Sequence, residues 1–444
     1  MSNYIPRKII DHLYLLVPTC CISFWALISL IKDNFNILGA SDFPAIYYAA
    51  KYIFTKPELV YSDAIQPQYP YTPCIATIFA PIALLSFETA HWIYFIITLL
   101  LSYLLIINFD QILKIKNVDR KLHRILFLLA ISNGLRYVQL FDYLTSKMWT
   151  ACFLIIFIRR EIEYRELNKD RENIKYKFVQ WMILIFAIGI SPQFFFLIFL
   201  YLFYNIKFKD IFTKKQIQNY LLMILVFTIQ NFMIFIIFFV APESIFFFFG
   251  GSWRGRKKVY WRNLTYEYLI KNRVRLPTDV ISHFFQVLSL HYDLSALNFD
   301  LLLLSLIIMS LITILIHHKK NLKLEEKFGY FSLFALLFYT MIAAPRYYIV
   351  LLPAIEILFI KHFEDCETLT NFIKTNFLIL LGLVCIVLLY FMPEIHYLAR
   401  VFPIIINIPI ELVLLRADYI YALLMIVIIK LSRRKIQNFD YHEI

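Results

Sequence analysis

Long apolar runs, separated by short charged clusters, dominate the pattern of the chain. Six runs have the length of a single helix, at about 13–31, 89–109, 219–241, 300–316, 373–391 and 410–430. Three longer runs, at about 122–158, 178–204 and 328–360, have room for two helices each. A helix needs about 20 apolar residues to cross roughly 30 Å of hydrocarbon. The pattern therefore predicts an all-α, polytopic membrane protein with about twelve transmembrane segments, several of them short or broken.

Each of the three longer runs is interrupted near its middle by residues that disfavour a continuous helix. The interruptions are Asn133-Gly134 with Arg136, Ser191-Pro192-Gln193, and Ala344-Pro345-Arg346. Broken helices are tolerated at membrane depth where protein or a water-filled cavity covers the freed backbone groups. We expect all three tips on the outer face, so together they indicate one shared cavity there. The alternative is that Pro192 and Pro345 only kink helices that pack on each other.

Basic residues fall mainly in short clusters between the apolar runs, so the net charge of +13 does not indicate nucleic acid as a partner. Cytoplasmic loops of membrane proteins carry an excess of Lys and Arg. Arg7 and Lys8 therefore place the N-terminus in the cytoplasm. The same side receives the clusters at 114–124, 159–177, 207–215, 317–327, 361–367 and 433–435. Both termini are expected to be cytoplasmic.

Composition agrees with a membrane protein, because 61% of the 444 residues are hydrophobic and 18% are aromatic. No soluble domain of ordinary size fits between the runs, so we expect a single domain over 1–444. The run from Leu13 to Ile31 has no small-residue cleavage site after it and is interpreted as a retained signal anchor. The six cysteines lack the spacing of a metal or redox site and are interpreted as packing residues.

The first outer-face loop, 32–88, is expected to carry amphipathic helices and places Asp42 where a membrane helix ends and water begins. An ionisable group at that depth is costly unless it is used. Asp42 is therefore the first functional candidate. The alternative is an N-cap, because Ser41 and Asp42 precede Pro44 and a helix that begins there would be capped by either residue. The two roles are compatible.

Tyrosines and one further carboxylate offer weaker candidates. Tyr47, Tyr48, Tyr69 and Tyr71 of the same loop can stack on a ligand or anchor the loop at the membrane interface, which is the usual role of Tyr there. Asp142 lies in an otherwise apolar run. It is interpreted as a buried ion-pair partner of Arg136 or Lys147, with a role in a site as the alternative.

A second outer-face loop, 242–299, is basic where the positive-inside rule predicts few basic residues. It includes Arg254, Arg256, Lys257 and Lys258, interleaved with Trp and Tyr. Guanidinium groups pair well with phosphate oxygens, and aromatic side chains favour the membrane interface. We expect contact with a lipid phosphate or an anionic headgroup. A solvated amphipathic loop is the alternative.

The residues around Asp42 and at the tips resemble glycosyltransferase family 87, the polyprenyl-phosphate-dependent mannosyltransferase-like enzymes of the GT-C superfamily. The matching segments of the first loop are Asp42, Tyr47-Tyr48-Ala49-Ala50, Tyr61, Tyr69-Pro70-Tyr71-Thr72-Pro73 and Ala80-Pro81-Ile82-Ala83. Gly134 to Gln139 is similar to a Gly-Gln tip of the family, and Ala344 to Pro353 is similar to its late proline motif, without the Trp. Ser191-Pro192 stands where the family usually has Lys-Pro, so that lysine is absent here.

The resemblance implies a GT-C-type fold with its site on the outer face, and it implies that Asp42 is the general base. An acceptor hydroxyl that attacks the anomeric carbon must lose its proton, and a carboxylate can take it. The implied partners of the donor phosphate are Arg346, Arg254, Arg256, Lys257 and Lys258. The implied substrate contacts are Tyr47, Tyr48, Tyr69, Tyr71, Gln139, Gln193 and Tyr347. The reaction requires no metal or other cofactor.

The expected activity is transfer of a hexose, with mannose the expected sugar, from a polyprenyl-phosphate donor to a lipid or glycan acceptor. Short loops and the resemblance favour a bacterial inner membrane as the location of the protein. Membrane lipids are then expected partners. The alternative is a transporter or flippase for a lipid-linked or anionic solute, but the two halves show no repeat, and the candidate charges lie at helix ends. A non-catalytic scaffold is a third hypothesis.

Overall fold

The computed structural model describes residues 13–32, 42–61, 69, 71–118, 121–132, 137, 140–141, 144–166, 173–191, 194–204, 212–242, 297–319, 322–338 and 348–364. Within these ranges every regular element is a helix, and there is no strand. The all-α prediction is therefore confirmed for this part of the chain. The apolar runs at 373–391 and 410–430 lie outside the described residues.

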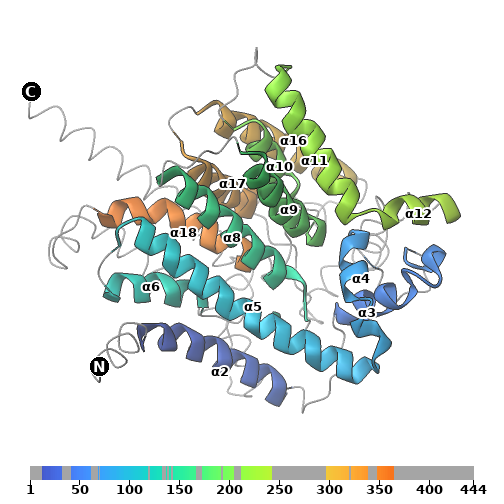
Figure 1. Ribbon diagram of the computed structural model, residues 1–444. Helices are drawn as coiled ribbons and strands as arrows, with labels where there is room; N and C mark the ends of the chain where they lie inside the picture. The colour runs from blue at the N-terminus through green and yellow to red at the C-terminus, as the bar shows by residue number, and fades with distance from the viewer. Residues whose placement is uncertain are drawn as a thin grey trace, which may run out of the picture.

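Most of the α-helices coincide with predicted apolar runs, and two short ones lie within the first loop, 32–88 (Figure 1). They are α2 (Leu16–Lys32), α3 (Phe43–Tyr52), α4 (Pro73–Phe79), α5 (Phe87–Ile115), α6 (Lys121–Ser132), α8 (Lys147–Glu166), α9 (Ile174–Ile190), α10 (Phe196–Leu202), α11 (Lys214–Gln230), α12 (Met233–Val240), α16 (Leu297–His318), α17 (Leu324–Phe338) and α18 (Tyr348–Glu364). Short 3-10 helices, η1 (Leu13–Leu15), η2 (Pro57–Leu59) and η3 (Ile82–Leu84), complete the set.

The three longer apolar runs each form two helices, as predicted. These pairs are α6 with α8, α9 with α10, and α17 with α18. The break between α9 and α10 falls at Ser191, which follows the last residue of α9. The predicted interruptions at 133–136 and 344–346, and Pro192 with Gln193, lie outside the described residues.

The apolar run at 219–241 departs from its prediction as a single helix. It forms α11 and α12, which meet at a bend of 65°. Asn231 is the C-cap of α11. Its backbone N–H makes the last helical hydrogen bond, to the Phe227 carbonyl at 2.9 Å, and its side-chain Nδ2 donates to the same oxygen at 3.2 Å. Asn competes with the backbone for such hydrogen bonds and therefore favours helix ends.

By length and composition, α5 is the one helix of the described residues that is long and apolar enough to cross a membrane by itself. The bent pair α11 and α12 is a second candidate span. Several other helices of the described residues are apolar but shorter, among them α2. The twelve crossings inferred from the sequence stay a prediction.

Helix α8 is at the centre of the described fold. It packs against α5 on one side and α9 on the other, and it also contacts α17 and α18 (Figure 1). Its apolar residues from Met148 to Ile162 are largely buried by these neighbours. The helix therefore joins the first-loop helices α3 and α4, which lie near its N-terminus, to α17, which lies near its C-terminus.

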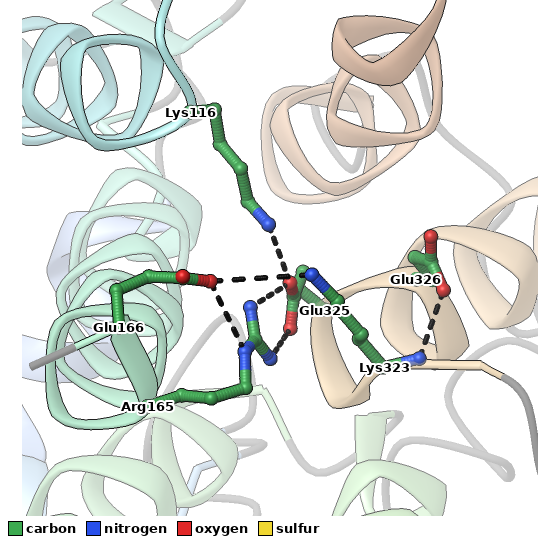
Figure 2. A network of polar contacts seen from close by, with 6 residues as sticks. All are labelled: Lys116, Arg165, Glu166, Lys323, Glu325 and Glu326. Atoms are coloured by element: carbon green, nitrogen blue, oxygen red, sulfur yellow. Dashed lines mark hydrogen bonds and ion pairs between the residues drawn. The ribbon is translucent and has the colours of Figure 1, made fainter. Parts of the chain in front are cut away.

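A network of charges holds three helix ends together at the C-terminus of α8 (Figure 2). Glu325, in the first turn of α17, is almost fully buried. Its carboxylate accepts a hydrogen bond of 3.0 Å from Nζ of Lys116, the residue that follows α5. Arg165 at the end of α8 donates to both Glu325 oxygens, one of them at 2.7 Å. We call this end of the molecule, with Lys116, Arg165 and Glu325, the charged end.

The charged end gathers residues from three basic clusters that the sequence places on one side of a membrane, 114–124, 159–177 and 317–327. Burial raises the pKa of Glu325, but the hydrogen bond from Arg165 and the charges of Lys116 and Arg165 outweigh it, so the pKa lies below its ordinary value. The glutamate is therefore ionised at neutral pH and attracts both cations. The compartment that this end faces stays a prediction.

Candidate functional site

Asp42 occupies the N-cap position of α3, as the capping alternative expects, but it does not cap the helix through its side chain. Its backbone is helical, with φ −71° and ψ −13°, and its carboxylate makes no capping hydrogen bond. An N-cap residue normally has an extended backbone that aims its side chain at the first turn. The half-buried Asp42 directly precedes Phe43, whose ring lies 5.3 Å from that of Tyr94 in α5.

Aromatic rings fix the start of α3 against α5 and α8. The Phe43 ring lies 5.4 Å from Phe87, 5.1 Å from His91 and 5.3 Å from Tyr94. Tyr94 in turn stacks on Trp149 of α8 at 6.0 Å. We call Phe43, Tyr94 and Trp149 the aromatic floor. It connects the helix that begins after Asp42 with the N-terminal turn of α8.

The four tyrosines named from the sequence mostly serve the fold of the first loop. The Tyr47 hydroxyl donates to Leu85 O at 2.8 Å, and the Tyr69 hydroxyl donates to Thr72 O at 2.8 Å. Tyr71 is buried, whereas Tyr48 is 37% exposed and stacks its ring on Phe87. Of the four, Tyr48 therefore presents the most ring surface, and the hydroxyls of Tyr47 and Tyr69 are engaged within the loop.

A buried lysine, Lys147, lies at the N-terminus of α8. From the sequence it was interpreted only as an ion-pair partner of Asp142. Lys147 is 2% exposed, and its Nζ donates to Ser191 Oγ at 3.1 Å. The same ammonium lies 5.4 Å from the centre of the Tyr71 ring. Ser191 Oγ is also 2.8 Å from Thr150 Oγ1. We call Tyr71, Thr72, Lys147, Thr150 and Ser191 the Lys147 cluster.

The cluster joins the first loop to the second interrupted run. Thr72 N donates to Gly189 O at 3.1 Å, near the end of α9. A Cβ added at Gly189 would lie 2.7 Å from Thr72 Oγ1, so only glycine lets the two segments approach this closely. The structure therefore brings the Tyr-Pro segment of the first loop next to Ser191, a contact that the sequence analysis did not predict. The cavity predicted for the three tips stays a prediction.

Sequence signals for Lys147 were present but ambiguous. A lysine directly before an apolar helix, after the hydroxyl residues Thr145 and Ser146, is ordinarily read as a charge at a membrane boundary. Its burial depends on Tyr71 and Ser191, which are 76 and 44 residues away. No local pattern reports contacts across that distance.

Other residues named from the sequence lie outside the described residues, so their roles stay predictions. They are Gln139, Asp142, Gln193, Arg254, Arg256, Lys257, Lys258, Arg346 and Tyr347. Within the described ranges, no group of three or more His, Cys, Asp or Glu side chains is placed to hold a metal ion. The expectation that no cofactor is needed also stays a prediction.

No family model matches the chain, and neither does any curated protein or solved structure. The resemblance to glycosyltransferase family 87 therefore rests on the quoted residues alone.

Proposed function

We propose that this protein is an integral-membrane glycosyltransferase of the GT-C type that transfers a hexose, with mannose the expected sugar, from a polyprenyl-phosphate donor to a lipid or glycan acceptor. The observation that carries the proposal is the state of Asp42. Its carboxylate lies at the start of α3, half-buried and not used to cap the helix. A carboxylate held at a helix start beside an aromatic floor suits a general base.

The proposed reaction has two bond changes at the anomeric carbon. The acceptor oxygen forms the new glycosidic bond while the bond to the phosphate oxygen breaks, and the polyprenyl phosphate leaves with the electron pair. Asp42 takes the acceptor proton. Aromatic side chains of the first loop, such as the exposed Tyr48, can bind the apolar face of the sugar.

Exposed apolar stripes support the placement in a membrane. Along α5 the side chains of Ile96, Leu100, Leu104 and Ile107 are 41–53% exposed, with the spacing of one helix face. Further exposed apolar side chains follow α2, α11 and α16, including Leu27, Leu221, Leu225, Ile307, Leu311 and Ile314. In water, helices turn such faces inward. Outward apolar stripes on four helices suit hydrocarbon as the solvent.

The distance between the two polar ends agrees with a bilayer. Lys147 is the first residue of the 20-residue α8, and Arg165 is its last residue but one. At 1.5 Å per residue, about 27 Å separates them along the axis. The hydrocarbon core of a bilayer is about 30 Å thick. Helix α8 thus has the length to reach from the Lys147 cluster on one face to the charged end on the other.

The proposed setting is a bacterial inner membrane with both chain termini in the cytoplasm and Asp42 on the outer face. This orientation follows from the distribution of Lys and Arg in the sequence. The charged end would then face the cytoplasm, and the Lys147 cluster would face outward. The proposed partners are the lipid-linked donor, the acceptor and membrane lipids.

The test is transfer by the purified protein from radiolabelled polyprenyl-phosphate mannose, with the glucose and arabinose donors in parallel. Asp42→Asn keeps the shape of the side chain but removes its basicity, so we expect transfer to fall roughly 100-fold or more. Glu88→Gln is the matched control, because Glu88 is an exposed carboxylate in the first turn of α5. Full transfer by Asp42→Asn would reject Asp42 as the base.

A flippase for a lipid-linked anionic solute is the second candidate, favoured by the buried Lys147. A cation at that depth serves the binding of an anionic headgroup whether or not a sugar is transferred. Absence of transfer from all three donors, together with Lys147-dependent binding of a lipid phosphate, would favour this function.

A further inference from the structure

We infer that the end of α5 farther from Asp42 binds the headgroup of an anionic phospholipid, whose acyl chains lie along α2 and α5. The binding groups are Lys114 and Arg124, which we call the basic pair. The inference rests on the proposed membrane setting but not on sugar transfer. Lys114 lies 27 residues after Phe87, the first residue of α5, which is about 40 Å along a helix. The site is therefore distinct from the proposed reaction centre at the start of α5.

A buried carboxylate, Asp110, holds the basic pair together where η1, α5 and α6 meet. Its Oδ2 forms an ion pair of 2.6 Å with Lys114 Nζ and accepts from the Tyr14 hydroxyl at 2.6 Å. Arg124 Nη1 lies 4.0 Å from its Oδ1. The Arg124 guanidinium is also 5.0 Å from the centre of the Tyr14 ring, within the range of a cation–π interaction. Three elements thus fix two cations around one carboxylate.

The carboxylate of Asp110 does not satisfy Arg124. A separation of 4.0 Å is beyond hydrogen-bond distance. Arg124 is 8% exposed, and within the described residues its buried Nε and Asp110 Oδ1 have no hydrogen-bond partner. A buried guanidinium normally uses its donors. Two cations and one carboxylate also leave this cluster with a charge of +1. An anionic group that reaches Arg124 supplies both the missing acceptor and the missing charge.

Lys114 continues the exposed apolar stripe of α5. The stripe consists of Ile96, Leu100, Leu104 and Ile107, and Lys114 follows Ile107 by about two helical turns on the same face. The Lys114 side chain is 39% exposed. A lipid chain that lies against the stripe therefore has its headgroup at the ammonium of Lys114.

The exposed stripe of α2 adjoins that of α5. Figure 1 shows α2 beside α5, and a hydrogen bond of 2.7 Å joins the hydroxyls of Ser23 and Tyr103 across the two helices. One turn further on the same helix faces stand Leu27 and Ile107, which are 51% and 41% exposed. The two stripes therefore form one continuous apolar surface.

The chemistry of this surface and its polar end matches an anionic phospholipid. Both stripes end at the basic pair, because Tyr14 precedes α2 and bonds to Asp110. A phospholipid brings apolar chains, which suit the stripes, and a singly charged phosphodiester, which suits the excess positive charge. Guanidinium and ammonium groups both bind phosphate oxygens, and basic residues at a membrane surface attract anionic lipids. A lipid without net charge would leave that excess uncompensated.

The experiment measures binding of single lipids to the purified protein in a neutral detergent by native mass spectrometry. Phosphatidylglycerol carries the chains and a negative headgroup, phosphatidylcholine carries the chains without net charge, and glycerophosphoglycerol carries the headgroup alone. We expect wild type to bind phosphatidylglycerol roughly tenfold more tightly than phosphatidylcholine, the factor that one charge-assisted hydrogen bond provides. Equal affinity for the two lipids would overturn the inference. Equal affinity for phosphatidylglycerol and its headgroup alone would also overturn it.

Arg124→Gln should weaken phosphatidylglycerol binding roughly tenfold and leave phosphatidylcholine binding unchanged, because it removes a charge and its paired donors. Lys175→Gln is the matched control. Lys175 is an exposed lysine in the first turn of α9, on the same side of the proposed membrane, and its loss removes the same charge. This control should bind phosphatidylglycerol like wild type. Equal losses in the two Gln variants would indicate general attraction by basic residues and reject the site.

Asp110→Asn separates a lipid site from a cluster that only holds helices together. The substitution removes the negative charge, while the amide oxygen can still accept from Tyr14. At a lipid site, phosphatidylglycerol binding should then be at least as tight as in wild type, because the net positive charge increases. At a purely structural cluster, Asp110→Asn and Arg124→Gln would both lower the melting temperature, and neither would change the preference between the two lipids. That result would contradict the inference.

The two proposals fail separately. Asp42→Asn should bind phosphatidylglycerol like wild type, because Asp42 lies at the other end of α5. Phosphatidylglycerol binding that depends on Arg124, without sugar transfer by wild type, would reject the glycosyltransferase and keep the lipid site. Sugar transfer by a protein that does not distinguish the two lipids would keep the enzyme and reject the lipid site.

Discussion

At the scale of single residues, the proposed chemistry depends on the carboxylate of Asp42, whose surroundings differ from those of the buried Lys147. Asp42 is half-buried at the start of a short helix, whereas Lys147 is 2% exposed at the start of a long one.

Gly189 offers a test of how closely the first loop must approach α9. Glycine to alanine within a helix normally stabilises a protein by roughly 0.5–1 kcal/mol. Here the added Cβ would lie 2.7 Å from Thr72 Oγ1. We expect Gly189→Ala to destabilise the protein by about 1–3 kcal/mol, the usual range for overpacking, measured by thermal unfolding in detergent.

A second substitution at Thr72 identifies the cause of the Gly189→Ala effect. Thr72→Ala removes the crowded oxygen, so the double variant should recover most of the lost stability. Independent, additive effects of the two substitutions would show that the close approach is not what requires glycine.

At the scale of helices, the charged end shows how three separate helix ends become one unit. Arg165 and Lys116 both bind Glu325, which is 1% exposed. Removing one partner of a buried pair leaves the other charge without compensation, which typically costs several kcal/mol. Figure 2 shows that Glu166, Lys323 and Glu326 lie around this core.

Glu325→Gln should therefore destabilise the packing of α5, α8 and α17. We expect a loss of about 3 kcal/mol in unfolding free energy, because Arg165 and Lys116 lose their shared counter-charge. Glu326→Gln is the matched control, since Glu326 accepts only from the Lys323 backbone at 2.8 Å among its recorded bonds and glutamine can also accept. Equal effects of the two variants would reject the network as the cause.

The helices themselves were largely predictable, and their exceptions have local causes. Apolar runs of the right length predicted α5, α16 and the paired helices of the three longer runs. The bend between α11 and α12 was missed, because Asn231, with Gln230 before it, is a polar residue in a run of strongly apolar ones. A hydropathy pattern averages over such a residue, whereas the backbone responds to its hydrogen bonds.

At the scale of the whole molecule, polar ends and apolar flanks form layers. The Lys147 cluster and the charged end lie at opposite ends of α8, and exposed apolar stripes follow α5, α11 and α16. This layering is what the proposed membrane setting requires of a helical protein. It also separates the proposed chemistry from the charges that hold the helices together.

The stability of the molecule should depend on pH through Glu325. Its folded-state pKa lies below the ordinary value, so its contribution is fully present above the ordinary pKa. The contribution is lost as the pH falls through the folded-state pKa. Wild type should therefore exceed Glu325→Gln in melting temperature at about pH 7, and the difference should narrow in acid. A difference that stays constant down to about pH 3 would contradict this assignment.

The candidate site was only partly predictable. Asp42, Tyr71 and Ser191 were identified, because a carboxylate after an apolar run, a Tyr-Pro segment and a broken helix are local signals. Lys147 was not identified as a site residue, and Gly189 was not singled out. Their importance depends on contacts with Tyr71, Thr72 and Ser191 that no local pattern contains.

The sequence by itself determined most of the helices, the all-α class of the fold and the choice of a carboxylate, Asp42, as the first site candidate. Helix formation and the transfer of apolar runs out of water depend on residues that are close together in the chain. Only the tertiary structure decided which hydroxyls and rings surround the ammonium of Lys147, and that Glu325 joins three helix ends. These contacts join residues 44 to 209 positions apart. They form because helix packing buries polar groups, and a buried polar group is stabilised by a hydrogen-bond partner on a neighbouring helix.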